Sequence, residues 1–149
     1  VSDIFNYLYL ELGDEEFENI FRVCLADNGS ELSNPTAIEV DPVDGVVRTR
    51  VFYCDPNAPY QKGSAERNHE FIRGFIPKGV DLGQYSQDDI TIMMNHINSY
   101  SRESLGNKCP YDVFRFFYGD KLLNLLGCTT IPAKQVKLNK SVFRKEVAE

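Results

Sequence analysis

Two carboxylates stand where an α/β protein can use them for chemistry. Asp27 follows the apolar stretch 20–25 and precedes a turn sequence, and Glu66 begins a helical pattern after a loop rich in Pro and Gly. Ligands of α/β proteins bind beyond the carboxyl ends of strands, and hard divalent cations prefer oxygen ligands. Together the two carboxylates therefore indicate a cation site. Each alone also fits a simpler role, as a turn residue or as an acid near a helix N-terminus.

Basic residues surround Glu66 in the sequence. They are Lys62, Arg67, Arg73 and Lys78, and residues 61–80 carry a net charge of +2. Such a group can face phosphates, but it is also common on a solvated surface. His69 lies on a neighbouring stripe of the same helix, so we expect a polar surface residue there rather than a metal ligand.

The composition is that of one globular domain with its own core. The chain has 149 residues, 42% of them hydrophobic and 26% charged, which excludes disordered and low-complexity classes. Its apolar runs are a few residues long, whereas a membrane span needs roughly 20. No secretory signal is visible and the four cysteines form no CxxC pair, so we expect a cytoplasmic protein without a zinc site. Cys24 is predicted to be a buried thiol.

Charge is distributed unevenly along the chain. The net charge is −6, which by itself argues against a nucleic-acid partner. Residues 1–20, however, hold six acids and no base, whereas residues 121–149 hold six bases and two acids. The net charge therefore describes neither end of the chain.

The apolar periodicity predicts alternating helices and strands in the first half. The expected elements are a helix at 4–12, a strand at 20–25, a short helix at 35–40 and a strand at 46–53. Ser2 is the expected N-cap of the first helix, and Gly13 ends it. The first strand is predicted to be buried on both faces, as in a parallel sheet. This order indicates an α/β unit.

The second half is predicted to be helical. After a loop at 55–63, the expected helices are 65–76, 90–100, one that starts at Pro110, and 121–126 as its extension. Ser64 is expected to cap the first of these helices, and Ser86 begins a capping-box sequence ahead of the second. The basic tail from Ala133 is expected to be a docked or frayed helix.

Three motifs in fixed order resemble a known family. They are Ala-Asp-Asn-Gly-Ser-Glu at 26–31, Phe-Tyr-Cys-Asp-Pro at 52–56 and Pro-Tyr-Gln-Lys-Gly-Ser-Ala-Glu-Arg-Asn at 59–68. This series resembles the catalytic core of bacterial insertion-sequence transposases, and most closely the IS-thirty family of DDE transposases. The similarity continues through Phe-Ile-Pro-Lys-Gly at 75–79 and Asn-His-Ile-Asn at 95–98, and covers about residues 20–120.

The resemblance implies an integrase-type, ribonuclease-H-like fold in which three acids bind two divalent ions, Mg²⁺ or Mn²⁺. Asp27 matches the second acid and Glu66 the third, and Asn28 and Gly29 would hold the turn that presents Asp27. The implied contacts to the DNA backbone are made by Lys62, Arg67, Asn68, Arg73 and Lys78. The implied partners are double-stranded DNA, as transposon ends and target, and further copies of the chain. The implied location is the bacterial cytoplasm, with association to the nucleoid when the protein is bound to DNA.

The first acid of the family pattern has no match in this chain. The acids before Asp27 all fall in helical or turn-like sequence, and they are Asp3, Glu11, Asp14, Glu15, Glu16 and Glu18. We therefore expect a catalytic core that lacks its first strands, inactive alone, over residues 1–120, followed by a basic helical extension over 121–149. The unpaired strand edge is expected to pair with a second copy or to lie under the N-terminal helix.

Two other functions remain open from the sequence. A non-catalytic interaction or assembly module would explain the missing acid, the net charge of −6 and the apolar side chains of the late helices, which are Phe114, Phe117, Leu122 and Leu125. A nuclease directed at RNA could use the same fold, although the Pro-Tyr-Gln-Lys-Gly loop favours a transposase.

Overall fold

The computed structural model describes residues 1–26, 29, 32–55 and 59–143 of the chain. The chain divides into two compact units, Val1–Gly63 and Ser64–Glu149. By sequence the first unit has 12 acids and 4 bases, and the second has 10 acids and 12 bases. The acidic character of the chain therefore belongs to the first unit. No helix in the described part of the chain is long and apolar enough to cross a membrane.

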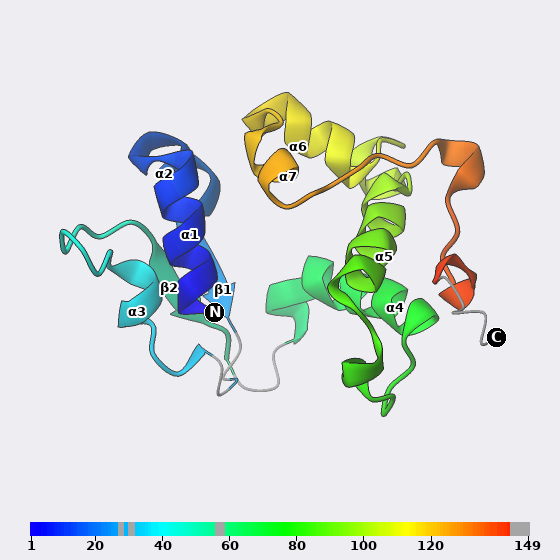
Figure 1. The fold of residues 1–149 in the computed structure, drawn as a ribbon, viewed down its shortest axis with the longest axis horizontal. Helices are drawn as coiled ribbons and strands as arrows, with labels where there is room; N and C mark the ends of the chain where they lie inside the picture. Colours follow the sequence, from blue (N-terminus) through cyan, green and yellow to red (C-terminus); the bar gives the residue numbers. More distant parts are fainter. Residues whose placement is uncertain (27–28, 30–31, 56–58, 144–149) are drawn as a thin grey trace. The chain divides into compact units, whose positions relative to one another are not determined.

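The first unit contains a two-stranded parallel sheet (Figure 1). Strand β1 (Val23–Ala26) pairs with β2 (Arg50–Tyr53), with Val23 opposite Arg50 and Ala26 opposite Tyr53. The short helix α3 (Thr36–Glu39) lies in the connection between the strands. The predicted strand–helix–strand unit is thus confirmed. Among the described residues β1 is hydrogen-bonded to β2 alone, so pairing of its other edge with a second copy stays a prediction.

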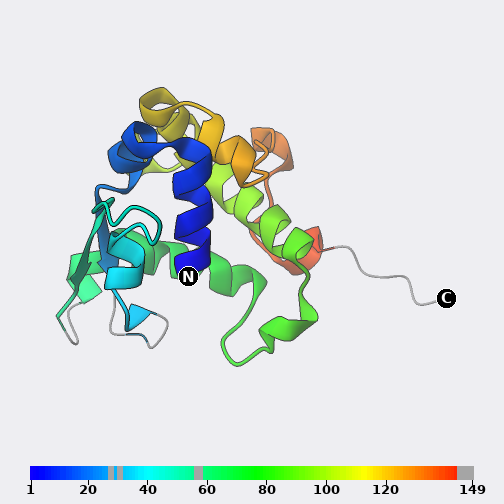
Figure 2. The same ribbon diagram turned by 60° about the vertical axis from the view of Figure 1, so that its left-hand side comes forward.

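Helices α1 (Ser2–Leu12) and α2 (Asp14–Phe21) precede the sheet. Helix α1 packs against α2 and α3 (Figures 1 and 2). Gly13 ends α1 with a φ of 82°, as expected, but Ser2 is not its cap, because the helix starts at Ser2 and no side chain caps it. Helix α1 thus makes its main contacts with α2 and α3, and its cover of the open edge of β1 stays a prediction.

The predicted strand at 20–25 is wrong in its start and in its burial. Helix α2 continues to Phe21, because the rings of Phe17 and Phe21, four residues apart, stack at 4.9 Å on the side that faces α1. The strand itself is half exposed, with Val23 53% and Leu25 60% accessible. Successive strand residues face opposite sides, and these two share the exposed side of the sheet with Phe52. Cys24, predicted to be buried, is half-buried.

The second strand is also shorter than predicted from 46–53. Val47 makes an isolated antiparallel bridge with Val40, and Arg48 then turns its side chain into the interior. The Arg48 Nε donates to the Ile38 carbonyl at 2.9 Å, and its Nη2 donates to Asn6 Oδ1 at 2.6 Å. Its Nη1 lies 3.7 Å from Asp41 Oδ1. A buried guanidinium, rather than an apolar strand, therefore joins α1, α3 and β2.

Helices α4 (Gly63–Phe75) and α5 (Gln87–Ser99) form the core of the second unit. Phe75, Ile76, Met93 and Ile97 are buried together between them. Ser86 caps α5 through a complete capping box with Asp89, as predicted. Helix α4 begins at Gly63, directly after the 3₁₀ turn Pro59–Lys62, so Ser64 lies inside the helix rather than ahead of it.

Helices α6 (Pro110–Tyr118) and α7 (Lys121–Leu125) complete the helical part. Pro110 starts α6 as predicted, but α7 is a separate helix, because Gly119 adopts a φ of 73° and ψ of −164°. The Tyr111 hydroxyl donates to Asn95 Oδ1 at 2.7 Å, and the same oxygen accepts the Thr129 N–H at 3.0 Å. Burial raises the pKa of Tyr111 and keeps the hydroxyl a donor in this bond.

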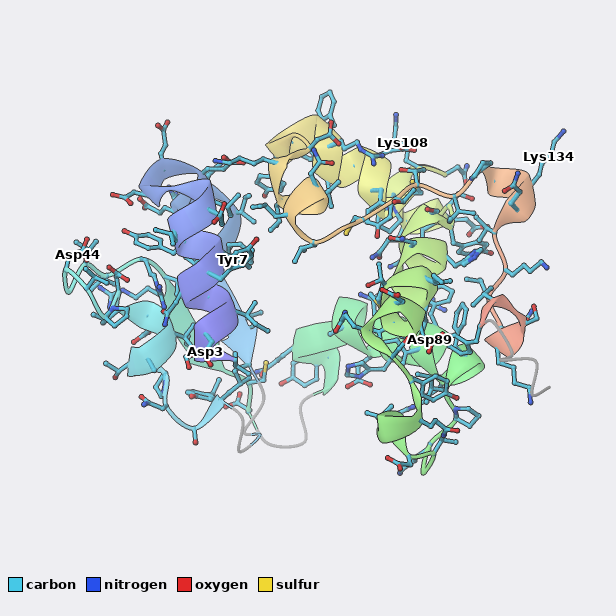
Figure 3. The ribbon with its side chains drawn as sticks, viewed as in Figure 1. Asp3, Tyr7, Asp44, Asp89, Lys108 and Lys134 are labelled. Atoms are coloured by element: carbon cyan, nitrogen blue, oxygen red, sulfur yellow. The ribbon has the colours of Figure 1, made fainter. Side chains whose placement is uncertain are left out.

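The tail after α7 is docked, but not as an α-helix. It contains two 3₁₀ turns, Ala133–Gln135 and Lys140–Val142, and packs Leu138, Val142 and Phe143 against the α4–α5 core. The Lys137 N–H donates to Nδ1 of His96 at 3.2 Å. Burial and the charge of Lys137 lower the pKa of His96, so this nitrogen stays an acceptor below the ordinary histidine range. Figure 3 shows the Lys134 side chain projecting away from the tail.

Candidate active site

The carboxyl edge of the sheet is the expected location of Asp27. Ala26 is buried at the end of β1 opposite Tyr53, and the Cys54 N–H donates to the Ala26 carbonyl at 2.9 Å. Asp27 and Asn28 lie outside the described residues. Gly29 accepts the Leu32 N–H at its carbonyl at 3.1 Å, which is a turn contact of the kind expected after the strand.

A reciprocal hydrogen-bonded pair that was not predicted from the sequence closes the loop after β2. The Asp55 N–H donates to Gln61 Oε1 at 2.8 Å, and Gln61 Nε2 donates to Asp55 Oδ2 at 2.9 Å. Asp55 is thus a second acid just beyond a strand end, and its carboxylate is held by an amide. The signal in the sequence was an acid and an amide flanking the two prolines of the loop.

Glu66 lies in the first turn of α4, and its side chain is exposed. The unpaired N–H groups of a helix N-terminus favour a negative charge at this place. Among ion pairs between described residues, Arg67 pairs with Glu70 at 3.6 Å and none includes Glu66. His69 is exposed, as predicted. The carboxylate of Glu66 is thus accessible to a ligand from solvent.

Arg102 contacts the opposite side of α4, a contact that no sequence pattern indicated. Its Nη2 donates to Asn68 Oδ1 at 3.0 Å, and its guanidinium carbon lies 5.0 Å from the centre of the Phe71 ring. At about 100° per residue, these two positions lie roughly 160° and 140° around the helix from Glu66. Arg102 therefore contacts the back of the helix whose front presents Glu66.

Arg102 has no carboxylate partner in the part of the chain that the structure describes. Burial and the nearby charge of Arg67 lower the pKa of its guanidinium. The Nε atom is buried and meets no acceptor among the described residues. The arginine is therefore held by one amide oxygen and one ring face.

Replacing Arg102 with methionine is expected to loosen the start of α4. Loss of a charged hydrogen bond and a cation–π contact costs about 1–3 kcal/mol, so amide exchange in α4 should speed up while α5 changes little. Hydrogen exchange followed by NMR measures both helices at once. Arg73→Met, an exposed position on the same helix, serves as the control and should leave exchange unchanged. Equal exchange in the Arg102 variant and the native chain would contradict the assigned contact.

The structure describes the side chains of four of the five residues that are expected to contact DNA. Arg67, Arg73 and Lys78 are exposed, and Asn68 is half-buried because its oxygen accepts from Arg102. The Lys62 side chain lies outside the described part. Three of the five side chains are therefore accessible to a phosphate, and their contact with DNA stays a prediction.

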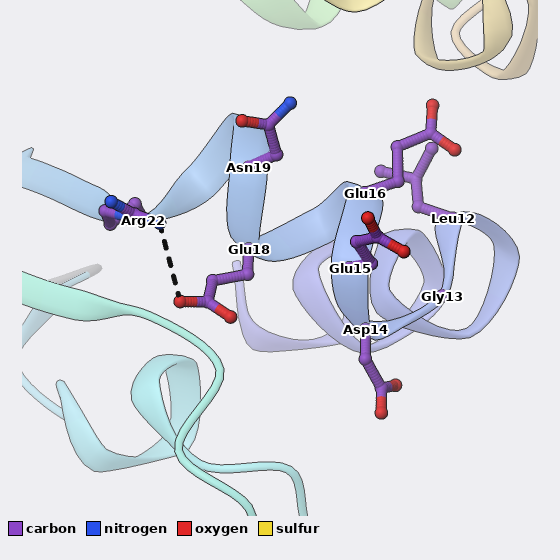
Figure 4. Close-up of a pocket in the computed structure, with 8 residues that line it drawn as sticks. All are labelled: Leu12, Gly13, Asp14, Glu15, Glu16, Glu18, Asn19 and Arg22. Carbon is purple, nitrogen blue, oxygen red and sulfur yellow. Dashed lines mark ion pairs between the residues drawn. The ribbon is translucent and has the colours of Figure 1, made fainter.

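A hollow at the α1–α2 turn contains other acids (Figure 4). Asp14, Glu15, Glu16 and Glu18 line it together with Arg22, whose Nη2 lies 3.9 Å from Glu18 Oε1. None of the expected site residues that the structure describes lines it. No group of three His, Cys, Asp or Glu side chains able to hold a metal occurs among the described residues. The six acids that precede Asp27 in the sequence all lie on α1 or α2.

Comparison with curated proteins decides the relationship. The chain is 33% identical over 87 residues to the transposase for insertion sequence element IS1086 of Cupriavidus metallidurans. It is 32% identical over 87 residues to transposase InsI for IS30A of Escherichia coli, and 26% identical over 98 residues to the transposase for IS4351 of Bacteroides fragilis. The chain is homologous to IS30-type insertion-sequence transposases.

The homology to IS30-type transposases covers much of this chain but little of its relatives. The IS1086 and IS30A matches each take in 58% of the chain, and the IS4351 match takes in 66%. The chain spans only 24%, 21% and 28% of the lengths of those transposases, respectively. No family model matches the chain, and no solved structure matches it. The resemblance predicted from the three motifs is confirmed.

Proposed function

We propose that this chain supplies two of the three metal-binding acids of a DDE-type transposase. The homology to IS30-type transposases over 87 residues carries the proposal. The motifs around Asp27 and Glu66 resemble the same family. The parallel β1–α3–β2 unit, with Asp27 next after β1, supports a ribonuclease-H-like core. The exposed carboxylate of Glu66 suits Mg²⁺ or Mn²⁺, which take oxygen ligands.

Asp27 and Glu66 would each bind a divalent ion through carboxylate oxygens. Two such ions would polarise the scissile phosphodiester and lower the pKa of an attacking hydroxyl. Lys62, Arg67, Asn68, Arg73 and Lys78 would hold backbone phosphates of double-stranded DNA, which positions the strand without reading its sequence. Asn28 and Gly29 would shape the turn that presents Asp27.

The chain is proposed to be inactive alone, since two carboxylates leave one ion without a full set of ligands. The first acid would come from a strand paired with the open edge of β1. On this proposal residues 1–120 belong to the catalytic core and 121–149 to an extension. The proposed partners are transposon ends, target DNA and further copies of the chain, and its place of action is the nucleoid.

Binding of Mn²⁺ tests the proposal directly in this chain. The paramagnetic ion should broaden the NMR amide signals around residues 27 and 66 together. Asp27→Asn and Glu66→Gln should each abolish the broadening at both places, because the ion is shared. Glu70→Gln on the same helix is the matched control, because Glu70 pairs with Arg67, and it should keep the broadening.

Two outcomes count against the proposal. Broadening confined to residues 14–18 would show that Mn²⁺ prefers the acidic turn between α1 and α2. Broadening at residue 66 that persists in Asp27→Asn would show that the two carboxylates do not act together. Either result would favour the simpler roles, in which Asp27 is a turn residue and Glu66 is an acid near a helix N-terminus.

An assembly module is the second candidate function. It is favoured by the aromatic end of α6, where Phe116 is 83% and Phe117 65% exposed. Phe114 of the same helix, in contrast, packs against Cys109, Tyr111 and Leu123. Sedimentation of the native chain and of Phe116→Ser and Phe117→Ser variants separates the candidates. Loss of an oligomer with unchanged Mn²⁺ binding would leave both functions in place, whereas an oligomer without Mn²⁺ binding would favour the module.

A further inference from the structure

The docked tail carries positive charge without any acid. Residues 121–143 contain four lysines and no Asp or Glu. Lys134, Lys137 and Lys140 stand three residues apart, and all three are exposed. In the described part of the chain, none of these three forms an ion pair. An uncompensated row of this kind attracts an anionic partner.

Apolar contacts hold this row in a set place on the second unit. Leu138, Val142 and Phe143 pack on the α4–α5 core, and the Phe143 ring lies 4.9 Å from the Tyr85 ring and 6.1 Å from the Phe75 ring. The backbone bond from Lys137 to His96 adds a polar anchor. The apolar side chains thus face inward while the lysines face solvent. We name residues 134–140 the lysine track.

The track crosses α4 at Gly74, next to Arg73. A Cβ atom at Gly74 would lie 3.1 Å from the Leu138 carbonyl oxygen, which is closer than side chains normally approach. The glycine therefore permits the contact between the tail and the helix. This contact places the track against α4, the helix that carries Glu66 and the bases near it.

We infer that the lysine track binds the phosphodiester backbone of double-stranded DNA. The inference rests on the proposed function, which makes DNA the partner, and adds a binding surface outside the three motifs. Three exposed ammonium groups on one docked segment suit backbone phosphates and read no base sequence. Because the tail is already docked, binding does not have to order it, which favours affinity. The surplus of bases in the second unit agrees with this partner, in contrast to the acidic first unit.

Salt dependence of duplex binding by the full chain tests the track. Each phosphate contact adds about 0.9 to the slope of log K against log salt. The variant K134Q/K137Q/K140Q should therefore lose about 2.7 from the slope seen with the native chain on a mixed-sequence duplex. Lys108→Gln, an exposed lysine elsewhere in the unit, is the control and should leave the slope unchanged. A triple variant with the native slope would overturn the inference.

Gly74→Val tests the placement of the track with its charges intact. The larger side chain should push Leu138 away, speed hydrogen exchange at the Lys137 amide, and reduce duplex affinity at least tenfold. Native affinity in a variant whose tail exchanges freely would overturn the inference, because the lysines would then act without docking. Tighter binding of duplex RNA than of duplex DNA by the native chain would overturn the choice of partner.

The two proposals fail separately. A native chain that binds no duplex at low salt, yet binds Mn²⁺ through Asp27 and Glu66, would overturn the lysine track and leave the metal site standing. A chain that binds duplex with the predicted slope changes, but shows no shared Mn²⁺ site, would do the reverse. Glu66→Gln should change the Mn²⁺ result and leave the salt slope unchanged or slightly steeper.

Discussion

Replacing Arg48 with alanine is expected to lower the free energy of unfolding of the first unit by about 3–5 kcal/mol. The Arg48 side chain is fully buried and that of Asp41 is 11% exposed, with 3.7 Å between Nη1 and Oδ1. Its guanidinium carbon also lies 5.4 Å from the centre of the Tyr9 ring. Removing the arginine leaves the nearly buried Asp41 carboxylate without its cationic partner, and the Asn6 oxygen and the Ile38 carbonyl without their donor.

Three further variants separate charge, hydrogen bonding and volume at this place. Arg48→Lys keeps the charge but loses the planar set of donors, so it should recover only part of the stability. Arg48→Met fills the volume and should resemble alanine in leaving Asp41 unpaired. Arg22→Ala removes an exposed pair with Glu18 and should change stability by about 0.5 kcal/mol or less.

Urea unfolding of the first unit, followed through amide exchange in α1 and β2, measures these differences. The unit must be followed by its own signals, because two compact units need not unfold together. Arg48→Ala within about 1 kcal/mol of the native chain would contradict a central role for the guanidinium.

Replacing Phe75 with alanine is expected to cost the second unit about 3–5 kcal/mol. Phe75 is fully buried in the cluster with Ile76, Met93 and Ile97, and Phe143 of the tail packs on its edge. The loss combines the transfer free energy of the ring with the cavity left behind. Because α4 also carries Glu66, the variant should weaken the start of the candidate site as well.

Phe116→Ala is the matched control for Phe75. The same chemical change at a ring that is 83% exposed should alter stability by about 0.5 kcal/mol or less. Chemical denaturation of both variants, followed by helical circular dichroism and by amide exchange in α5, gives the comparison. A Phe75 variant no less stable than the Phe116 variant would contradict the described core.

Local chemistry explains which parts of the fold were predictable. Gly13, Ser86 and Pro110 act within one turn of their own positions, through a left-handed backbone, a capping box and a fixed φ. Each of these signals was predicted and confirmed. The strand–helix–strand order was predictable for a similar reason, since β-branched and apolar runs between turns mark strands.

The boundaries failed where distant residues decide them. Helix α2 takes up Ile20 and Phe21 because aromatic rings of α1 and α2 meet, and nothing within 20–25 announces this. The second strand is shortened at Arg48, because this side chain donates hydrogen bonds to Ile38 and Asn6 and forms an ion pair with Asp41. In the tail, side-chain packing on α4 and α5 replaces the predicted helix with 3₁₀ turns.

The sequence by itself determined the similarity to IS30-type transposases and which carboxylates to test, because motif order and residue type are properties of the chain alone. Only the tertiary structure decided what surrounds those residues. Asp55 is held by Gln61, Asn68 is held by Arg102, and the lysine track lies across α4 at Gly74. Each depends on side chains or backbone groups brought together by folding, the last two across more than 30 residues of chain. Local patterns carry no record of such contacts.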